Sequence, residues 1–301
     1  MKRVLVTGGR GFIGRNCVEP LLERGFEVHT VGQTDFERPN GVIWYQGDVL
    51  NPIDRSRMLD VVQPSHLLHA AWDLTVPDYM SSSINYRWVA ASLDLTHEFA
   101  AGGGDRVLFI GSCYEYEWGD AALDERTTPL RPRTQYGKSK AHLFRTVTDL
   151  VEATDISMAW SRLFFLYGPH EGRRRLVPRV ITSLLSGREA PTSHGLQERD
   201  YMYSVDVGSA LASLLDSNVD GAVNIGTGEA PPIVDLVSEV AEICGEPNLL
   251  RIGAIEGRPG EAPRVAAATD RLRQEVGWND YTPRREALER TVSWWRKELT
   301  K

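Results

Sequence analysis

A tyrosine and a lysine stand four residues apart in the segment Tyr136-Gly-Lys-Ser-Lys140, a spacing that places both side chains on one face of a helix. A tyrosine hydroxyl has an ordinary pKa of about 10 and is a poor acid or base at neutral pH. A neighbouring ammonium favours the phenolate, so we expect Lys140 to lower the pKa of Tyr136. Tyr136 could then exchange a proton with a substrate hydroxyl while a hydride moves to or from a nicotinamide. We therefore predict that Tyr136 and Lys140 are catalytic.

A third hydroxyl stands upstream, at the end of an apolar segment. Residues 106–110 read as a buried strand, and Gly111-Ser112-Cys113 follows directly. Ligands bind at the carboxyl edge of a doubly wound sheet. We expect Ser112 to donate to the same substrate oxygen as Tyr136.

A glycine-rich turn near the N-terminus has the setting of a dinucleotide-binding loop. The apolar run Val4–Val6 leads into the turn, and an apolar-periodic helix follows it. The glycines at positions 8, 11 and 14 permit the tight turn, the approach of a pyrophosphate and close packing of the helix on the strand. The helix N-terminus offers free N–H donors to the phosphates. We expect cofactor contacts from Gly8, Arg10, Gly11, Phe12, Ile13 and Gly14.

The second strand, expected over Phe26–Val31, ends without the acidic residue that binds the adenine ribose in NAD-binding units. Gly32 and Gln33 stand there instead, and Arg10 could pair with an additional phosphate. Asp35 follows slightly late and keeps NAD(H) possible. The sequence predicts NADP(H) as the preferred cofactor, with Gln33 at its edge.

Further cofactor contacts are expected at the ends of the next two strands. Asp48, after a strand over 41–46, could accept from the adenine amino group or cap the next helix; Val49 adjoins it. Ala70 and Ala71 end the apolar segment 64–71, and their small side chains would let the cofactor approach closely.

Strand and helix patterns alternate up to residue 166, which is typical of a parallel sheet with helices on both faces. Beyond Tyr167 the alternation breaks. We predict a doubly wound Rossmann domain over 1–166 and about 204–228. A smaller, discontinuous α/β substrate domain is expected over 167–203 and 229–301.

Composition restricts the class of protein. The chain has 301 residues and a net charge of −7, which disfavours nucleic acid and anionic membranes as partners. No apolar run approaches the ~18 residues of a membrane span, and no signal segment precedes the first strand. Three cysteines without C-x-x-C spacing argue against a disulfide framework or a metal site. We expect a cytoplasmic enzyme.

The chain resembles the extended short-chain dehydrogenase/reductases of the nucleotide-sugar epimerase/dehydratase group. The resemblance covers nearly the whole chain and is carried by TGGRGFIG at the start, YGKSK in the middle, RDYMYSVDV (199–207), NIGTGE (224–229), RPGE (258–261) and VGW…ERTVSWW at the end. It implies a Rossmann domain of about seven strands and a small C-terminal substrate domain. It also implies a homodimer through a four-helix bundle, formed here by helices at about 84–101 and 136–153.

The resemblance also implies substrate contacts. Arg199 and Arg258 match arginines that hold the pyrophosphate of a nucleotide-diphosphate sugar, a role that suits a bidentate guanidinium. His170 could face the sugar or be an ordinary loop histidine. Gly-Ser-Cys is similar to GDP-fucose synthase, an NADP-dependent reductase, in which a matching cysteine is an acid/base. Cys113 could have that role or be a partly buried thiol.

Departures from the group's patterns indicate the reaction. The 4,6-dehydratases have Asp-Glu after the hydroxyl residue, whereas this chain has Cys113-Tyr114, so dehydration is disfavoured. We predict an NADPH-dependent reductase of a nucleotide-linked 4-keto-6-deoxy sugar, with an NAD-dependent nucleotide-sugar 4-epimerase as the alternative. A regulator that has lost catalysis is disfavoured because Tyr136, Lys140 and Ser112 are intact.

Overall fold

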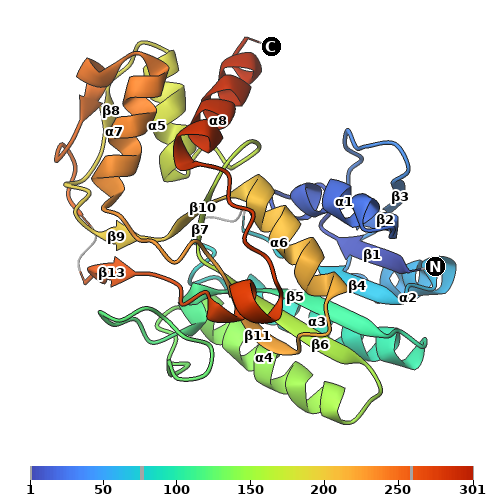
Figure 1. The fold of residues 1–301 in the computed structure, drawn as a ribbon. Helices are drawn as coiled ribbons and strands as arrows, with labels where there is room; N and C mark the ends of the chain where they lie inside the picture. The colour runs from blue at the N-terminus through green and yellow to red at the C-terminus, as the bar shows by residue number, and fades with distance from the viewer. Residues whose placement is uncertain (1, 75–77, 258–259, 301) are drawn as a thin grey trace.

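The computed structural model describes residues 2–74, 78–257 and 260–300. A sheet of seven parallel strands lies at its centre, in the order β11-β6-β5-β4-β1-β2-β3 (Figure 1). The strands are β1 (Arg3–Thr7), β2 (Glu27–Gly32), β3 (Ile43–Gln46), β4 (His66–His69), β5 (Arg106–Ser112), β6 (Ser157–Leu163) and β11 (Gly221–Ile225). The order reverses direction at β1, as in a doubly wound fold. The predicted Rossmann architecture is confirmed.

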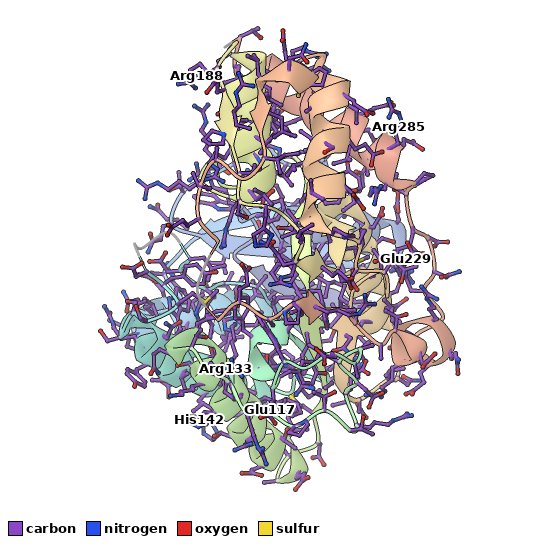
Figure 2. All side chains as sticks on the ribbon, turned by 90° about the vertical axis from the view of Figure 1, so that its left-hand side faces the viewer. Glu117, Arg133, His142, Arg188, Glu229 and Arg285 are labelled. Carbon is purple, nitrogen blue, oxygen red and sulfur yellow. The ribbon has the colours of Figure 1, made fainter. Side chains whose placement is uncertain are left out.

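The last third of the chain leaves this sheet and returns to it. Its helices α5 (Leu176–Leu185), α7 (Ile233–Cys244) and α8 (Arg284–Glu298) pack together away from the sheet (Figure 1). Between α5 and α7, the chain adds α6 (Ser204–Asp216) and β11 to the sheet unit. Arg188 and Arg285 mark the helical end of the molecule, whereas Arg133 and His142 lie at the sheet end (Figure 2).

Short elements connect these two parts. They are β7 (Phe165–Tyr167), β8 (Ala190–Pro191), β9 (Glu198–Arg199), β10 (Tyr201–Tyr203), β12 (Leu250–Arg251), β13 (Arg264–Val265), the 3-10 turns η1 (Cys113–Glu115) and η2 (Pro247–Leu249), and one π-turn η3 (Arg271–Glu275). Asp200 separates β9 from β10, and α6 begins directly after β10, at Ser204. Strands β7 and β10 pair in parallel, with Phe165 beside Tyr201.

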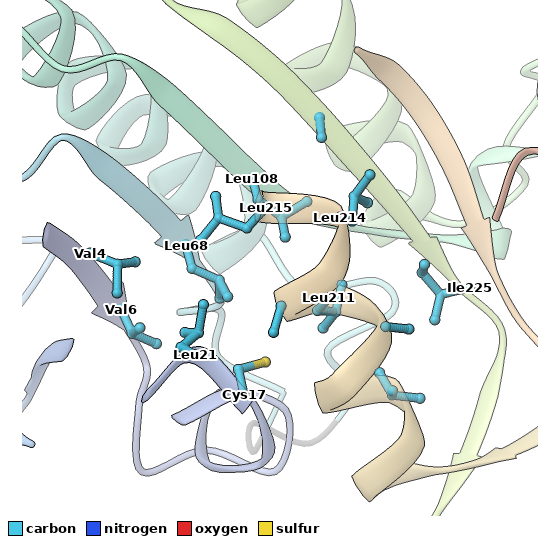
Figure 3. Close-up of a cluster of buried hydrophobic side chains, with 14 of the residues drawn as sticks. Val4, Val6, Cys17, Leu21, Leu68, Leu108, Leu211, Leu214, Leu215 and Ile225 are labelled. Carbon is cyan, nitrogen blue, oxygen red and sulfur yellow. The ribbon is translucent and has the colours of Figure 1, made fainter. Parts of the chain in front are cut away.

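The sheet is covered on both faces. Helices α1 (Gly14–Glu23) and α6 cover one face, and α2 (Pro52–Val62), α3 (Ile84–Ala101) and α4 (Gln135–Glu152) cover the other (Figure 1). Alternation along β1 explains why: Val4 and Val6 enter the core under α1 and α6, whereas Leu5 enters the core on the opposite face. Figure 3 shows the first core, where Leu21 and Leu211 meet the strands. Each buried aliphatic side chain contributes about 1.5–3 kcal/mol, so these cores fix the strand ends that carry the site.

The described residues contain no membrane-spanning helix, no cluster of metal ligands and no disulfide. No helix among them is long and apolar enough to cross a membrane. In the same ranges, no group of three or more His, Cys, Asp or Glu side chains could hold a metal ion. Cys17, Cys113 and Cys244 are free and buried.

Candidate active site

The glycine loop lies between β1 and α1, at the carboxyl edge of the sheet. Gly8 has a φ of 70°, and the N–H of Gly11 donates to its carbonyl at 2.8 Å. A Cβ at Gly14 would lie 2.4 Å from the oxygen of Gly8, and a Cβ at Gly8 would lie 2.9 Å from Cα of Ala71. The loop is therefore a cradle that side chains would fill, which fits a dinucleotide pyrophosphate at the start of α1. Phe12 and Ile13 are half-buried behind it.

The end of β2 leaves open space beside Gly32. A Cβ at Gly32 would meet only the oxygen of Thr34, at 3.9 Å, and Gln33 is exposed. Asp35 is turned toward its own neighbour Arg38, with which it forms an ion pair. Arg10 is exposed, and its charge helps to lower the pKa of Arg15, which is lowered first by burial. Positive charge is thus concentrated at this edge.

The other predicted cofactor residues lie along the same edge. Asp48 is half-buried and accepts from the N–H of Leu50 at 2.9 Å. The alternative that Asp48 caps the next helix is wrong, because Asn51 caps α2 by accepting from Ile53. Val49 is buried. Ala70 and Ala71 are half-buried and lie against the glycine loop.

The catalytic candidates meet where α4 begins beside the end of β5. A Cβ at Gly137 would lie 2.2 Å from the carbonyl oxygen of Tyr114, so the first turn of α4 packs directly on η1. Ser112 caps η1 by accepting from the N–H of Tyr114 at 3.3 Å, and its side chain lies close enough to Tyr136 to lower the pKa of that hydroxyl. Tyr136 is buried, with 8% of its surface exposed. The structure brings Tyr136 and Ser112 together as predicted.

Lys140 lies one turn further along α4 and points inward, whereas His142 lies on the outer face of the helix (Figure 2). Its Nζ donates to the carbonyl of Ile110 at 2.8 Å and lies 3.5 Å from the centroid of the Trp72 ring. Burial lowers the pKa of Lys140 to about 7. Trp72 is held in turn by a hydrogen bond to Asn85 at 2.8 Å. Trp72 was not predicted from the sequence, although it directly follows Ala70-Ala71, where cofactor contacts were expected.

The predicted lowering of the pKa of Tyr136 is wrong for the chain alone. Burial raises the pKa of Tyr136, and the nearby Tyr79 and Glu115 raise it further, against a hydrogen bond from Ser112 that lowers it. Lys140 has little effect here because its Nζ is 6.0 Å from the centroid of the Tyr136 ring and is turned to Ile110 and Trp72. In the chain alone the hydroxyl of Tyr136 is therefore neutral near pH 7.

Cys113 is in the interior and not in the cleft. Its side chain is 1% exposed and packs among apolar residues of the loop that follows β5. Burial raises the pKa of the thiol, and the charges of Asp200 and Glu115 raise it further. The alternative of a buried thiol is favoured over an acid/base.

A group of residues missed by the sequence analysis extends from Tyr136 toward β10. The ring of Tyr79 contacts that of Tyr136 at 5.4 Å, and Arg175 donates to the Tyr79 hydroxyl at 3.2 Å. Glu171 is buried, and its Oε2 has no hydrogen-bond partner within the described ranges. Burial raises the pKa of Glu171 to about 8, against the charge of Arg175. The charge interaction of Glu171 with Tyr201 places this carboxyl beside β10.

The three predicted substrate residues have different environments. Arg199 is 2% exposed, donates to the carbonyls of Glu198 and Ala262 at 2.7 and 2.8 Å, and pairs with Glu261 at 3.1 Å. Its guanidinium is thus bound by the chain itself. Arg258 lies outside the described residues. His170 is exposed, and its ring packs on Trp294 of α8 at 4.4 Å, which supports the alternative of an ordinary loop histidine.

A cavity of about 260 Å³ opens behind Arg199. Its lining includes Tyr203, Thr227 and Tyr281 but none of the three catalytic candidates. This cavity therefore lies apart from the proton-transfer groups, and we do not include it in the active site.

Comparisons with known proteins agree with this geometry. The model of the NAD dependent epimerase/dehydratase family matches residues 4–226. A UDP-glucose 4-epimerase of Azospirillum brasilense is 26% identical over 99% of this chain and 92% of that protein. A dTDP-D-glucose 4,6-dehydratase of Mus musculus is 24% identical over 99% of this chain and 90% of that protein. The crystal structure of Thermus thermophilus UDP-glucose 4-epimerase in complex with NAD superposes with a TM-score of 0.87, at 26% identity, and covers 98% of this chain and 99% of that one.

Proposed function

Because the chain belongs to the NAD dependent epimerase/dehydratase family, we propose that it is an NAD(P)-dependent nucleotide-sugar 4-epimerase. The sequence favoured a reductase of a 4-keto sugar, with the epimerase as its alternative. The relatives support the alternative better, because they include UDP-glucose 4-epimerases and the solved neighbours include one with NAD.

The observation that carries the proposal is a single proton-transfer centre. Ser112 lies beside Tyr136 and lowers the pKa of its hydroxyl against burial, and the residue after Ser112 is a buried thiol with a raised pKa. A dehydratase needs a second acid next to the first, whereas an epimerase needs one group that takes and returns the same proton. This arrangement therefore supports oxidation and reduction at one carbon.

The cofactor would be held by the glycine loop, with Gly8 against Ala71, and by Lys140. When bound, the nicotinamide supplies the hydride acceptor and donor. In its phenolate form, which the positive charge of an oxidised nicotinamide would favour, Tyr136 Oη takes the proton of the 4-hydroxyl and returns it to the same oxygen after the sugar has turned. Ser112 orients that oxygen, and the Lys140 ammonium stabilises the phenolate.

Three further statements belong to the proposal. We place the cofactor in residues 1–166 and 204–228 and the nucleotide-diphosphate sugar in residues 167–203 and 229–301, with Arg199 as a framework for the phosphate region. We expect a homodimer through the exposed faces of α3 and α4. We also expect the protein to be cytoplasmic.

The test is incubation of the purified protein with UDP-glucose, UDP-N-acetylglucosamine and dTDP-glucose without added cofactor. We expect interconversion of 4-epimers, followed by the anomeric proton signals, and a retained dinucleotide in native mass spectrometry. A 4-keto-6-deoxy product would show a dehydratase instead. If the protein turns over only a 4-keto sugar, and only with added NADPH, the reductase interpretation would be favoured over the epimerase.

The reductase stays the second candidate because of the open end of β2. Gly32 leaves space where an acidic side chain would repel a 2′-phosphate, and Arg10 is exposed beside it. Arg10→Ala should weaken NADPH by about 10- to 100-fold, since a charge-assisted hydrogen bond is worth about 1.5–3 kcal/mol, and should leave NADH nearly unchanged. Fluorescence titration with both cofactors measures this, and Arg188→Ala, far away on the helical end (Figure 2), is the control. Equal weakening of both cofactors would remove the NADP preference.

A further inference from the structure

A fully buried carboxylate lies beneath the proton-transfer groups and has no part in the chemistry described above. Glu115 ends η1 with none of its surface exposed. Its Oε1 accepts from the backbone N–H of Ser112 at 2.7 Å, and its Oε2 accepts from Nε of Arg162 at 2.8 Å. The indole N–H of Trp160 donates to both oxygens, at 3.0 and 3.1 Å. Charges are rarely buried so completely unless each oxygen has partners, and here each has.

Space for this carboxylate is provided by a glycine. A Cβ at Gly111 would lie 2.1 Å from Nε1 of Trp160 and 2.6 Å from Oε1 of Glu115. Gly111, Trp160 and Glu115 come from β5, β6 and η1 and fit one another closely. The carboxylate is therefore a built feature of the end of β5.

The same strand end binds the catalytic lysine. Lys140 donates to the carbonyl of Ile110, and Glu115 accepts from the N–H of Ser112, so the two charged groups bind backbone atoms on either side of Gly111. Arg162 is held at its other end by the Tyr116 hydroxyl at 3.0 Å.

The surroundings of Lys140 contain few other charges. Tyr136 lies on its own helix, and His69 faces it from β4, held between Thr7 and Ser92. Burial lowers the pKa of His69 to about 3, so this histidine is neutral. The charge of Glu115 is the influence that raises the pKa of Lys140 against burial.

We propose that Glu115 is a positioning residue that keeps Lys140 in its ammonium form and holds Ser112 in register with Tyr136. Its importance for turnover rests on the proposed function, whereas its effect on the charge of Lys140 does not. A buried lysine near neutral pH would otherwise lose its proton and with it the ability to stabilise a phenolate. The negative end of the Glu115–Arg162 pair is thus used to hold a positive charge in the site.

The test is direct titration of the lysine side chains in the whole chain, without substrate. The protein has five lysines, so NMR of the ¹³Cε-labelled lysines gives few signals, and Lys140→Arg assigns the one of interest. In Glu115→Gln the pKa of Lys140 should fall by about 1 unit, the lower end of the effect of a nearby charge. Trp160→Phe removes hydrogen bonds to Glu115 but keeps its charge, so this control should leave the pKa unchanged. An unchanged titration in folded Glu115→Gln would overturn the proposal.

A second variant covers the case in which Glu115→Gln fails to fold because Arg162 is left buried and unpaired. Glu115→Gln combined with Arg162→Met removes both charges and should lower the pKa of Lys140 in the same direction, by less. An unchanged or raised pKa in this double variant would also overturn the proposal. Because no turnover is measured, a failure of the epimerase assay leaves this result intact. If the enzyme is active, the alkaline limb of its pH profile should move to lower pH in Glu115→Gln, whereas a loosened turn would only lower the rate at every pH.

Discussion

The proposed cofactor end and the proposed substrate end of the site are built by different means. At the cofactor end, the loop between β1 and α1 is shaped by backbone, with Gly8 at positive φ and Gly14 packed on its carbonyl. At the substrate end, side chains from distant segments are bound to one another, as when Arg199 holds the carbonyl of Ala262. A site shaped by backbone is determined by a short stretch of sequence. A site formed by side chains from distant segments depends on how those segments pack together.

The largest effect on turnover is expected at Tyr136 and Ser112, which lie between the two ends. Tyr136→Phe should lower turnover about 10²–10⁴-fold, the usual scale for loss of a general acid or base, because it removes the hydroxyl that Ser112 contacts. Steady-state kinetics measures turnover, and circular dichroism with native mass spectrometry serves as the control for folding and retained dinucleotide. Near-normal turnover would place the proton transfer outside these two residues.

At the cofactor end, the addition of one methyl group at Gly14 should weaken binding of the dinucleotide. Gly14→Ala places a Cβ 2.4 Å from the oxygen of Gly8, and overpacking of this kind costs about 1–3 kcal/mol. We expect the dinucleotide to bind about 10- to 100-fold more weakly, as measured by titration. Gly119→Ala is the matched control, because nothing lies within 4 Å of its Cβ. Unaltered affinity in Gly14→Ala would show that the loop is not shaped by close packing.

The same contrast explains what the sequence could and could not predict. The parallel sheet with helices on both faces, the glycine loop and the Tyr136–Lys140 spacing follow from local patterns of residues, whereas the resemblance supplied the number of about seven strands; the structure has the sheet and the loop where they were expected. The pair Glu115 and Arg162 is 47 residues apart in sequence and becomes a pair only when β6 lies beside β5. No local pattern marks either residue as buried.

The directions of the pKa shifts could not be predicted from the sequence either. The expectation for Tyr136 considered the charge of Lys140 and left out burial, which dominates in the chain alone. Similarly, the sequence analysis considered His170 of the Tyr-Gly-Pro-His-Glu segment, whereas its neighbour Glu171 is the buried one. Adjacent residues of a loop differ in burial because the backbone turns their side chains to opposite sides. The conformation of the loop depends on tertiary packing, which the local sequence does not determine.

At the substrate end, Glu171 should make stability depend on pH. Its pKa is raised to about 8 in the folded chain, whereas a glutamate in the unfolded chain ionises near pH ~4.3. Between these values the unfolded chain releases a proton that the folded chain keeps, so stability falls as pH rises. From pH 5 to pH 8 the wild type should lose about 1–3 kcal/mol relative to Glu171→Gln, measured by urea unfolding. Glu229→Gln, at an exposed position, is the control (Figure 2), and parallel pH curves for wild type and Glu171→Gln would contradict the prediction.

The smallest effect on turnover is expected from Cys113, which lies next to a residue of large expected effect. Cys113→Ala should change turnover by less than about threefold, because the thiol is 1% exposed and its raised pKa keeps it protonated, so it does not exchange its proton with a substrate near neutral pH. Ser112→Ala removes a hydrogen bond to a charged or reacting oxygen and should cost about 1.5–3 kcal/mol, about 10- to 100-fold in rate. Steady-state kinetics on the two single variants across pH 6–9 compares them directly.

The comparison of these neighbours tests whether the site has one proton-transfer group or two. An acid/base at position 113 would serve a reaction that moves protons at a second carbon. Cys113→Ala would then decrease turnover as much as Tyr136→Phe does, and it would remove one limb of the pH profile. A buried packing residue instead lowers the melting temperature of Cys113→Ala and leaves both limbs in place. For the same reason we expect Cys113 in the native chain not to react with iodoacetamide, because alkylation requires an accessible thiolate. Mass spectrometry of the treated protein would show whether Cys113 is alkylated. A large loss of turnover in a folded Cys113→Ala protein would therefore contradict the single-centre mechanism and with it the proposed epimerase.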